Sequence, residues 1–387
     1  MPRAGAYLKK EDLNKKEVSY PLDVYFCKSC TSVQLLDVIP RETLFGDYLY
    51  LSSVASKSVL EHFELYAKEI KERFFNPNGL IVEIACNDGI LLKPLKENGV
   101  RAIGIDPSKA VEVARKHGFE VINDYFGEKL AAELVDNFGK ADAIIANAVY
   151  AHVDDMDDMT HGIYAMLKDT GVFIFEVHHL ADIIKTFQYD SIYHEHMSYH
   201  SVYTLSLFLK KHGMEIFEIK HFPVRGGMIR IYARKIGKHK GNISPSVKET
   251  LEMEKHMKLD LYETFEKFGK QVHEHKERIK TILKKMKDEG KKIVAYGMAG
   301  RGNTLLNFWD IGTDIIDYGI DASPERYGRY VPGMHIPIIP PDGALKDVDY
   351  ALLIAWIFKK DILKKEKEFT ERGGKFLIPL PEPYLIP

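Results

Sequence analysis

Short apolar runs alternate with helix-like stretches, and this alternation constrains the fold more than any other feature of the sequence. From Leu80 to about Lys235 the runs are LIVEIA, AIGID, EVI, ADAIIANAV, VFIFEV and IRIYARK. Such an alternation is typical of a parallel, doubly wound sheet. A second series follows, with KKIVAYG, IIDYGID, YALLIAW and KFLIPLP. The sequence therefore predicts an α/β protein with two such units.

The rest of the chain sets the expected domain boundaries. With 387 residues, the chain is long for a single core. Residues 55–75 show the periodicity of an amphipathic helix, and residues 245–290 that of one or two more. We expect a small N-terminal region at 1–55, a core domain at 56–240, a helical connector at 241–290 and a C-terminal domain at 291–387.

Composition excludes several classes of protein. A formal net charge of −2 argues against binding to nucleic acid. No run of about eighteen apolar residues predicts a membrane span. The start MPRAGAYLKK lacks the apolar stretch of a signal peptide, and three cysteines do not suggest a disulfide scaffold. We expect a cytoplasmic protein.

One turn carries the first chemical motif. Asn87, Asp88 and Gly89 follow the first strand, Glu83 stands near the end of that strand, and Asp106 ends the second strand. Ligands of such folds bind at the carboxyl ends of the strands, where Asp106 could accept bonds from both ribose hydroxyls of a nucleoside. The G-x-G-x-x-G pattern of dinucleotide sites is absent. A carboxylate at Glu83 repels a pyrophosphate and suits a cationic nucleoside without phosphates, which is S-adenosylmethionine.

A second cluster, SIYHEHMSYH at residues 191–200, joins three histidines to a glutamate and two tyrosines. Such a cluster can supply a general base together with a hydrogen-bond donor for an oxygen that gains negative charge. Histidine suits the first task, and tyrosine or histidine the second. If the segment is extended, Tyr193 and Glu195 share one face, with His194 and His196 on the other. If it forms a turn, all four could share one pocket.

Together these motifs resemble the sugar C-methyltransferases that act on nucleotide-linked 4-keto deoxysugars. The resemblance rests on E-I-x-x-N-D-G, on the strand end IDPS and on YHEH, and it spans almost the whole chain. YPLDVYFCKSC resembles the N-terminal zinc-binding and substrate-binding region of that family, and AYGMAGRGNTLLN resembles its C-terminal domain. The family usually has Gly–Ser where this chain has Ala85–Cys86, and often His–Gly–Gly where it has Arg225–Gly226–Gly227.

The resemblance implies a Rossmann-like methyltransferase core that binds S-adenosylmethionine, and a second Rossmann-like domain that covers a nucleotide-linked keto-sugar. It implies an enzyme of deoxysugar biosynthesis, a monomer or homodimer. It makes His196 the general base, with Tyr193 and Glu195 in the same pocket, and His152 is a further candidate to hold the ketone oxygen. The candidate cofactor residues are Glu83, Ala85, Asn87, Asp88, Gly89, Asp106, Pro107 and Asn147. The candidate substrate residues are Tyr48, Tyr50, Arg225, Gly226, Gly227, Arg301 and Asn303.

Alternatives remain open at each site. His194 and His196 could bind a metal, joined by His178 or His200, although no firm metal spacing is present. Otherwise His178, His179 and His200 are expected to be polar core residues. Gly297, Gly300 and Gly302 lie between a strand and a helix, which on its own could serve a nicotinamide-dependent sugar-nucleotide reductase. A non-catalytic sugar-nucleotide-binding protein is the third possibility.

The expected zinc site has only part of its ligands in this sequence. Cys27 and Cys30 form one C-x-x-C, which is half of a four-cysteine zinc site, and the remaining cysteine, Cys86, lies in the cofactor turn. Two thiolates make a poor structural zinc site. Zinc is therefore left open, with Cys27 and Cys30 as the candidate ligands of an incomplete site.

Overall fold

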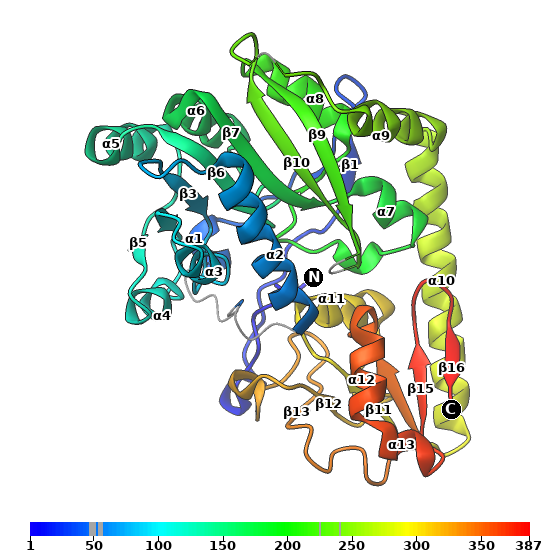
Figure 1. Ribbon diagram of the computed structural model, residues 1–387. Coiled ribbons are helices and arrows are strands. Elements are labelled where there is room, and N and C mark those ends of the chain that lie inside the picture. Colours follow the sequence, from blue (N-terminus) through cyan, green and yellow to red (C-terminus); the bar gives the residue numbers. More distant parts are fainter. Residues whose placement is uncertain (46–51, 53–56, 224–225, 240) are drawn as a thin grey trace.

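A computed structural model of the chain describes residues 1–45, 52, 57–223, 226–239 and 241–387. Two α/β units lie one above the other in Figure 1, and the long helix α10 (Tyr262–Asp288) runs along one side of both. The amino terminus lies between them. The α/β class expected from the alternation of apolar runs is confirmed.

The first unit is built on a mixed sheet with the order β5–β4–β3–β6–β7–β10–β9. The strands from β5 to β7 are parallel, whereas β10 is antiparallel to both β7 and β9. The strand bounds are β3 (Ile81–Ile84), β4 (Ala102–Ile105), β5 (Glu120–Ile122), β6 (Ala141–Asn147), β7 (Leu167–His178), β9 (Met214–Phe222) and β10 (Met228–Lys235).

One expectation about this sheet was wrong. The run IRIYARK was taken as part of the parallel series, but it lies in β10, which forms an antiparallel pair with β9. Only residues 223–227 separate these two strands, and a parallel pair would need a crossover of a dozen or more residues. The segment 214–222 was not recognised as a strand.

Helices cover both faces of the first sheet, as its strands require. Ile81 and Ile145 pack under α2 and α3, while Val82 and Ile144 pack with helices on the other face. Strands buried on both faces read as continuous apolar runs, which is why these were visible in the sequence. The helices are α2 (Lys57–Phe74), α3 (Leu92–Glu97), α4 (Val111–Lys116), α5 (Glu128–Phe138), α6 (Met156–Met166), α7 (Leu180–Lys185) and α8 (Val202–Lys211).

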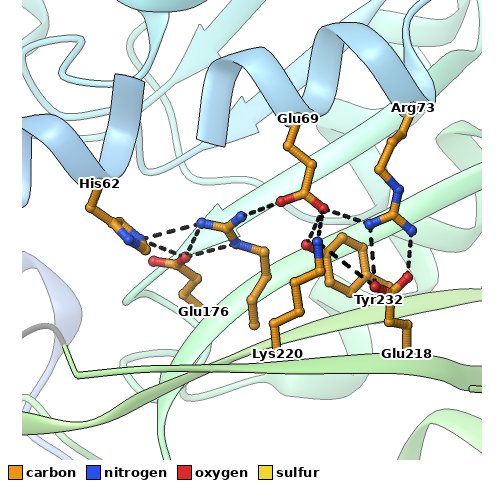
Figure 2. Close-up of polar contacts among 8 residues, drawn as sticks. His62, Glu69, Arg73, Glu176, Glu218, Lys220 and Tyr232 are labelled. Atoms are coloured by element: carbon orange, nitrogen blue, oxygen red, sulfur yellow. Dashed lines mark hydrogen bonds and ion pairs between the residues drawn. The ribbon is translucent and has the colours of Figure 1, made fainter. Parts of the chain in front are cut away.

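A network of charges fastens α2 to the sheet (Figure 2). The guanidinium of Arg230 in β10 donates to Glu176 in β7 at 2.6 Å and to Glu69 in α2 at 2.9 Å. His62 lies 2.8 Å from Glu176, and Lys220 in β9 lies 2.6 Å from Glu69. Arg230 and Glu176 are almost fully buried, so each needs the other to offset the loss of water. The network sets the register of α2 on the sheet.

The second unit has a smaller sheet of its own, with the order β13–β12–β11–β14–β15–β16. All pairs are parallel except β15 with β16. Ile279 and Leu283 of α10 are buried in the core of this unit. The helix α9 (Pro245–His256) precedes α10 and packs against β9 and α8 of the first unit. The elements of the second unit are β11 (Ile293–Tyr296), α11 (Gly300–Trp309), β12 (Gly319–Ile320), β13 (Ile338–Ile339), β14 (Tyr350–Leu353), α12 (Lys359–Lys365), α13 (Lys367–Glu371), β15 (Lys375–Ile378) and β16 (Tyr384–Ile386).

The N-terminal segment connects the two units. Its strands β1 (Val24–Phe26) and β2 (Val33–Leu35) form a small antiparallel sheet with β8 (Ser198–Tyr199), and α1 (Arg41–Phe45) follows. Leu8 forms a β-bridge with Tyr330, and the hydroxyl of Tyr7 donates to the Met298 carbonyl at 2.6 Å. The first eight residues are therefore held against the second unit. No helix among the described residues is long and apolar enough to cross a membrane.

Candidate active site

A cavity of about 570 Å³ lies where the N-terminal segment and the two α/β units meet. Arg3 and Tyr7 from the N-terminal segment line it, as do the carboxyl ends of β3, β4, β6 and β7. The second unit contributes the turn between β11 and α11. The strand order of the first sheet reverses between β3 and β6, which is where open α/β sheets bind ligands.

The turn after β3 forms one end of the cavity. Ala85 and Asn87 line it, and both have positive φ, 59° and 52°. The carboxylate of Asp106 accepts from the Asn87 amide at 2.9 Å and from the Ser108 amide at 2.8 Å. Asp106 and Pro107 also line the cavity. Asp106 thus fastens the turn and is also part of the cavity lining.

Glu83 lies beneath this turn rather than in the cavity lining. It is 2% exposed, and burial raises its pKa well above the usual range, an effect that the charges of Asp106 and Asp88 strengthen. Asn147 at the end of β6 lines the cavity, and its side chain interacts with Glu83, which opposes part of the rise in the pKa of that carboxyl. Asp88 and Gly89 do not line the cavity.

Residues 193–196 form a turn, closed by the His196 amide donating to the Tyr193 carbonyl at 2.9 Å. The turn brings Tyr193, Glu195 and His196 to the cavity. His194 faces away, and its ring nitrogen donates to the Pro21 carbonyl at 3.1 Å. Of the two conformations open at this segment, the chain adopts the turn.

The imidazole of His196 is held at both nitrogens. Its Nδ1–H donates to the Ser191 carbonyl at 2.7 Å, and its Nε2 accepts from the Tyr193 hydroxyl at 2.8 Å. Because a carbonyl can only accept, Nδ1 carries the proton and Nε2 carries the lone pair. Burial, together with the nearby side chains of His152, His178 and Arg301, holds the pKa of His196 well below its usual range. His196 is therefore neutral over the ordinary pH range.

Two further histidines lie beside His196 in the cavity lining. The ring of His152 lies 4.9 Å from that of His196, and the ring of His178 lies 5.7 Å from it, measured between centroids. His152 was expected here, whereas His178 was expected in the polar core and instead lines the cavity. The sequence could have indicated this role for His178, because it ends β7 and ligands of such folds bind at the carboxyl ends of strands. His179 and His200 are buried away from the lining.

Arginines gather at the end of the cavity formed by the second unit. Arg301, in the first turn of α11, donates to His178 at 2.9 Å and lies 3.6 Å from Asp190. Arg326 pairs with Asp321 at 2.9 Å, and Arg329 also lines the cavity. Sequence reasoning named only Arg301 among these, because Arg326 and Arg329 lie in an irregular segment whose fold was not predicted.

Several candidate substrate residues lie elsewhere. The amide of Asn303 donates to the Ala4 carbonyl and is outside the lining, so it holds the N-terminal segment in place. Gly226 and Gly227 pack against Gln188 and Asp182, away from the cavity. Tyr48, Tyr50 and Arg225 fall outside the residues that the structure describes. Gly297, Gly300 and Gly302 line the same cavity as His196 and do not form a separate dinucleotide pocket.

The two N-terminal thiols do not complete a zinc site. Cys27 follows β1, and Cys30 lies in the turn before β2. The backbone amides of Cys30 and Ser29 lower the pKa of Cys27, as a zinc-binding turn would require. Cys86 is buried in the turn after β3. Among the described residues, no third potential ligand lies close to the two thiols. Tetrahedral zinc needs four ligands, so these residues provide half of a site.

Comparisons with known proteins cover the whole chain. Residues 1–45 match the family model "Putative zinc binding domain", residues 59–219 "Methyltransferase domain" and residues 223–381 "C-methyltransferase C-terminal domain". The C-methyltransferase NovU of Streptomyces niveus is 32% identical over 388 residues, covering 100% of this chain and 92% of the relative. A ubiquinone biosynthesis O-methyltransferase of Chelativorans is 37% identical over 95 residues, which is 24% of this chain and 37% of the relative.

A solved glycopeptide N-methyltransferase, MtfA, in complex with S-adenosylmethionine is similar at 13% identity and a TM-score of 0.36. The alignment covers 44% of this chain and 93% of that protein.

Proposed function

Since this chain belongs to the family of S-adenosylmethionine-dependent C-methyltransferases, we propose that it methylates a carbon beside the ketone of a nucleoside-diphosphate-linked keto-deoxysugar. The observation that carries the proposal is a single cavity that joins three features. These are the turn beside Asp106, a neutral histidine with a fixed tautomer, and a group of arginines. Each feature matches one part of the two substrates.

The turn after β3 is where we place S-adenosylmethionine, which supplies an electrophilic methyl group. Asp106, which lines the cavity, can accept from the ribose hydroxyls. The side-chain amide of Asn147, which lines the cavity beside Glu83, can offer a donor and an acceptor to the amino-acid part of the ligand. Ala85, Asn87 and Pro107 complete the lining at this end.

His196 is the proposed general base. Its Nδ1–H is held by the Ser191 carbonyl, so its lone pair lies on Nε2 and faces Tyr193. The low pKa makes His196 neutral and ready to accept a proton, but it also makes the protonated form costly. A diphosphate bound at Arg301 would offset that cost, because its negative charge cancels one source of the positive field. Substrate binding would thus make His196 a stronger base.

The negative charge that develops on the ketone oxygen needs a donor in reach. We assign this role to His152, whose ring lies 4.9 Å from that of His196 and lines the same cavity. Tyr193 can donate to the oxygen once His196 holds a proton and no longer accepts from it. The arginines that the second unit contributes to the cavity suit the diphosphate, because one guanidinium group can donate two parallel hydrogen bonds to phosphate oxygens.

Hydrogen–deuterium exchange at the substrate carbon tests this proposal directly. With S-adenosylhomocysteine in place of the methyl donor, the wild-type protein in heavy water should place deuterium on the carbon beside the ketone. His196→Asn should slow this exchange by about 10²–10⁴-fold, because the base is gone. His194→Asn is the matched control: it lies in the same turn but faces Pro21, so its exchange rate should stay near wild type.

Two outcomes would count against the proposal. Wild-type exchange in His196→Asn would move the base to Tyr193 or Glu195. An absence of exchange with every keto-sugar nucleotide, while S-adenosylhomocysteine still binds, would remove the proposed substrate class and leave the methyltransferase assignment in place.

A further inference from the structure

Two histidines and a carboxylate gather outside the active-site cavity, on the first unit. His179 follows the end of β7 and immediately precedes α7, Asp182 lies in the first turn of α7, and His221 lies near the end of β9. One potential ligand atom from each lies within 4.8 Å of the others. None of the three lines the cavity, so the proposed methyl transfer does not use them.

His179 is the unusual member of this group. It is 0% exposed, and its Nε2 lies 2.6 Å from the Glu254 carboxylate, to which it donates. Its Nδ1 is buried and has no hydrogen-bond partner among the described residues. That nitrogen lies 3.9 Å from the Asp182 carboxylate, too far for a hydrogen bond. With the proton held at Nε2, the lone pair lies on Nδ1, the nitrogen that lies 3.9 Å from Asp182.

We propose that His179, Asp182 and His221 bind a divalent transition metal, for which Zn²⁺ is the best match. Imidazole nitrogens and a carboxylate are common zinc ligands, at about 2.0–2.2 Å from the ion. Two imidazoles favour zinc over Mg²⁺ or Ca²⁺, which take oxygen ligands. His221 is exposed, so its ring can rotate to close the site, and water can take the fourth position.

The surroundings support the same assignment. A metal-bound histidine usually donates its other N–H to a carboxylate, which is what His179 does toward Glu254. Glu254 is itself fixed, since it accepts from the backbone amides of Val202 and Tyr203 at 2.6 and 2.9 Å. Gly227 has φ 115°, and a Cβ there would lie 3.1 Å from the Asp182 carboxylate. Gly227, which was a candidate substrate residue from the sequence, therefore leaves room beside Asp182.

The test measures Zn²⁺ binding to the full chain by calorimetry after removal of bound metal. Cys27→Ser/Cys30→Ser serves as the parent, because the two thiols would otherwise bind zinc as well. The parent should bind one equivalent of Zn²⁺ and gain thermal stability from it, and Mg²⁺ should do neither. Adding His221→Ala should weaken binding roughly 100-fold or more, since even outer partners of metal ligands contribute 10–100-fold.

Two more variants separate this site from weak binding at the surface. Asp182→Asn in the same parent should also weaken binding strongly, because it removes the charged ligand. His117→Ala, which removes an exposed histidine after α4, should leave the affinity unchanged. A parent that binds no zinc, or an affinity that His221→Ala and Asp182→Asn leave unaltered, would overturn the proposal.

Discussion

At the scale of single residues, Glu195 places a pH dependence inside the cavity. Burial raises the pKa of its carboxyl to about 7, and the nearby charge of Arg3 lowers it only in part. The folded state therefore holds a proton that the unfolded state releases near pH 4.5. Stability from this group is complete below about pH 4.5 and is lost as the pH rises through about 7. Glu195→Gln should abolish this loss, which amounts to roughly 3 kcal/mol.

Urea unfolding across that pH window measures the effect. The wild-type free energy of unfolding should fall relative to Glu195→Gln between about pH 4.5 and 8. Glu72→Gln on the exposed side of α2 is the control, since its side chain is in water in both states and the pH profile should not change. Parallel profiles for wild type and Glu195→Gln would show that the carboxyl is not held in its protonated form.

At the scale of elements, the turn after β3 packs closely against strand β4. A Cβ at Gly104 would lie 2.5 Å from the Cys86 sulfur and 2.8 Å from Leu92 Cδ1. Cys86 stands between Ala85 and Asn87, whose positive φ values are costly for residues with a side chain. Gly104→Ala should therefore destabilise the fold by about 1–3 kcal/mol, the usual cost of overpacking. Because the turn must move, S-adenosylhomocysteine should also bind more weakly.

Gly269→Ala is the matched control for this prediction. Gly269 lies within α10, and a Cβ there would meet nothing within 4 Å. Alanine favours a helix over glycine, so this variant should gain about 0.5–1 kcal/mol. Urea melts of the two variants should shift in opposite directions, and a shift of the same sign in both would contradict the packing at Gly104.

At the scale of the whole molecule, the two units contribute different parts of one site. The first unit forms the turn beside Asp106, and the second carries Arg329 at the other end of the cavity. We expect Arg329→Ala to weaken binding of a nucleoside diphosphate by roughly 10–100-fold, the cost of one charged hydrogen bond. It should leave S-adenosylhomocysteine affinity unchanged. Asp106→Ala should show the reverse pattern, with a cofactor loss of about 2–3 kcal/mol.

Calorimetry with each ligand alone distinguishes the two effects. Loss of both affinities in either variant would mean that the cavity collapses as a whole. Such a collapse would follow from loss of the N-terminal segment, whose strand β2 pairs with β8 of the first unit and whose Leu8 bridges to Tyr330 of the second. Circular dichroism on both variants serves as the folding control.

Local pattern was enough to predict the strongly apolar strands of both sheets, though not β9, and the sheet edge that carries the candidate site. Continuous apolar runs indicated strands buried on both faces, and strand ends placed Asp106 and His152 at the same edge. The helix expected at 55–75 corresponds to α2 (Lys57–Phe74), and the helical stretch at 245–290 to α9 and α10. These features depend on side-chain periodicity over a few residues, which a sequence displays directly.

Tertiary structure alone decided which of these residues meet. The turn at residues 193–196 turned His194 away from the cavity and His196 toward it, a choice that the sequence pattern left open. Arg301 contacts His178, which lies 123 positions away in the chain. His179 and His221 come close because β7 and β9 both pair with the same strand, β10. Such contacts depend on how the sheets, helices and N-terminal segment dock, and local periodicity carries no information about docking.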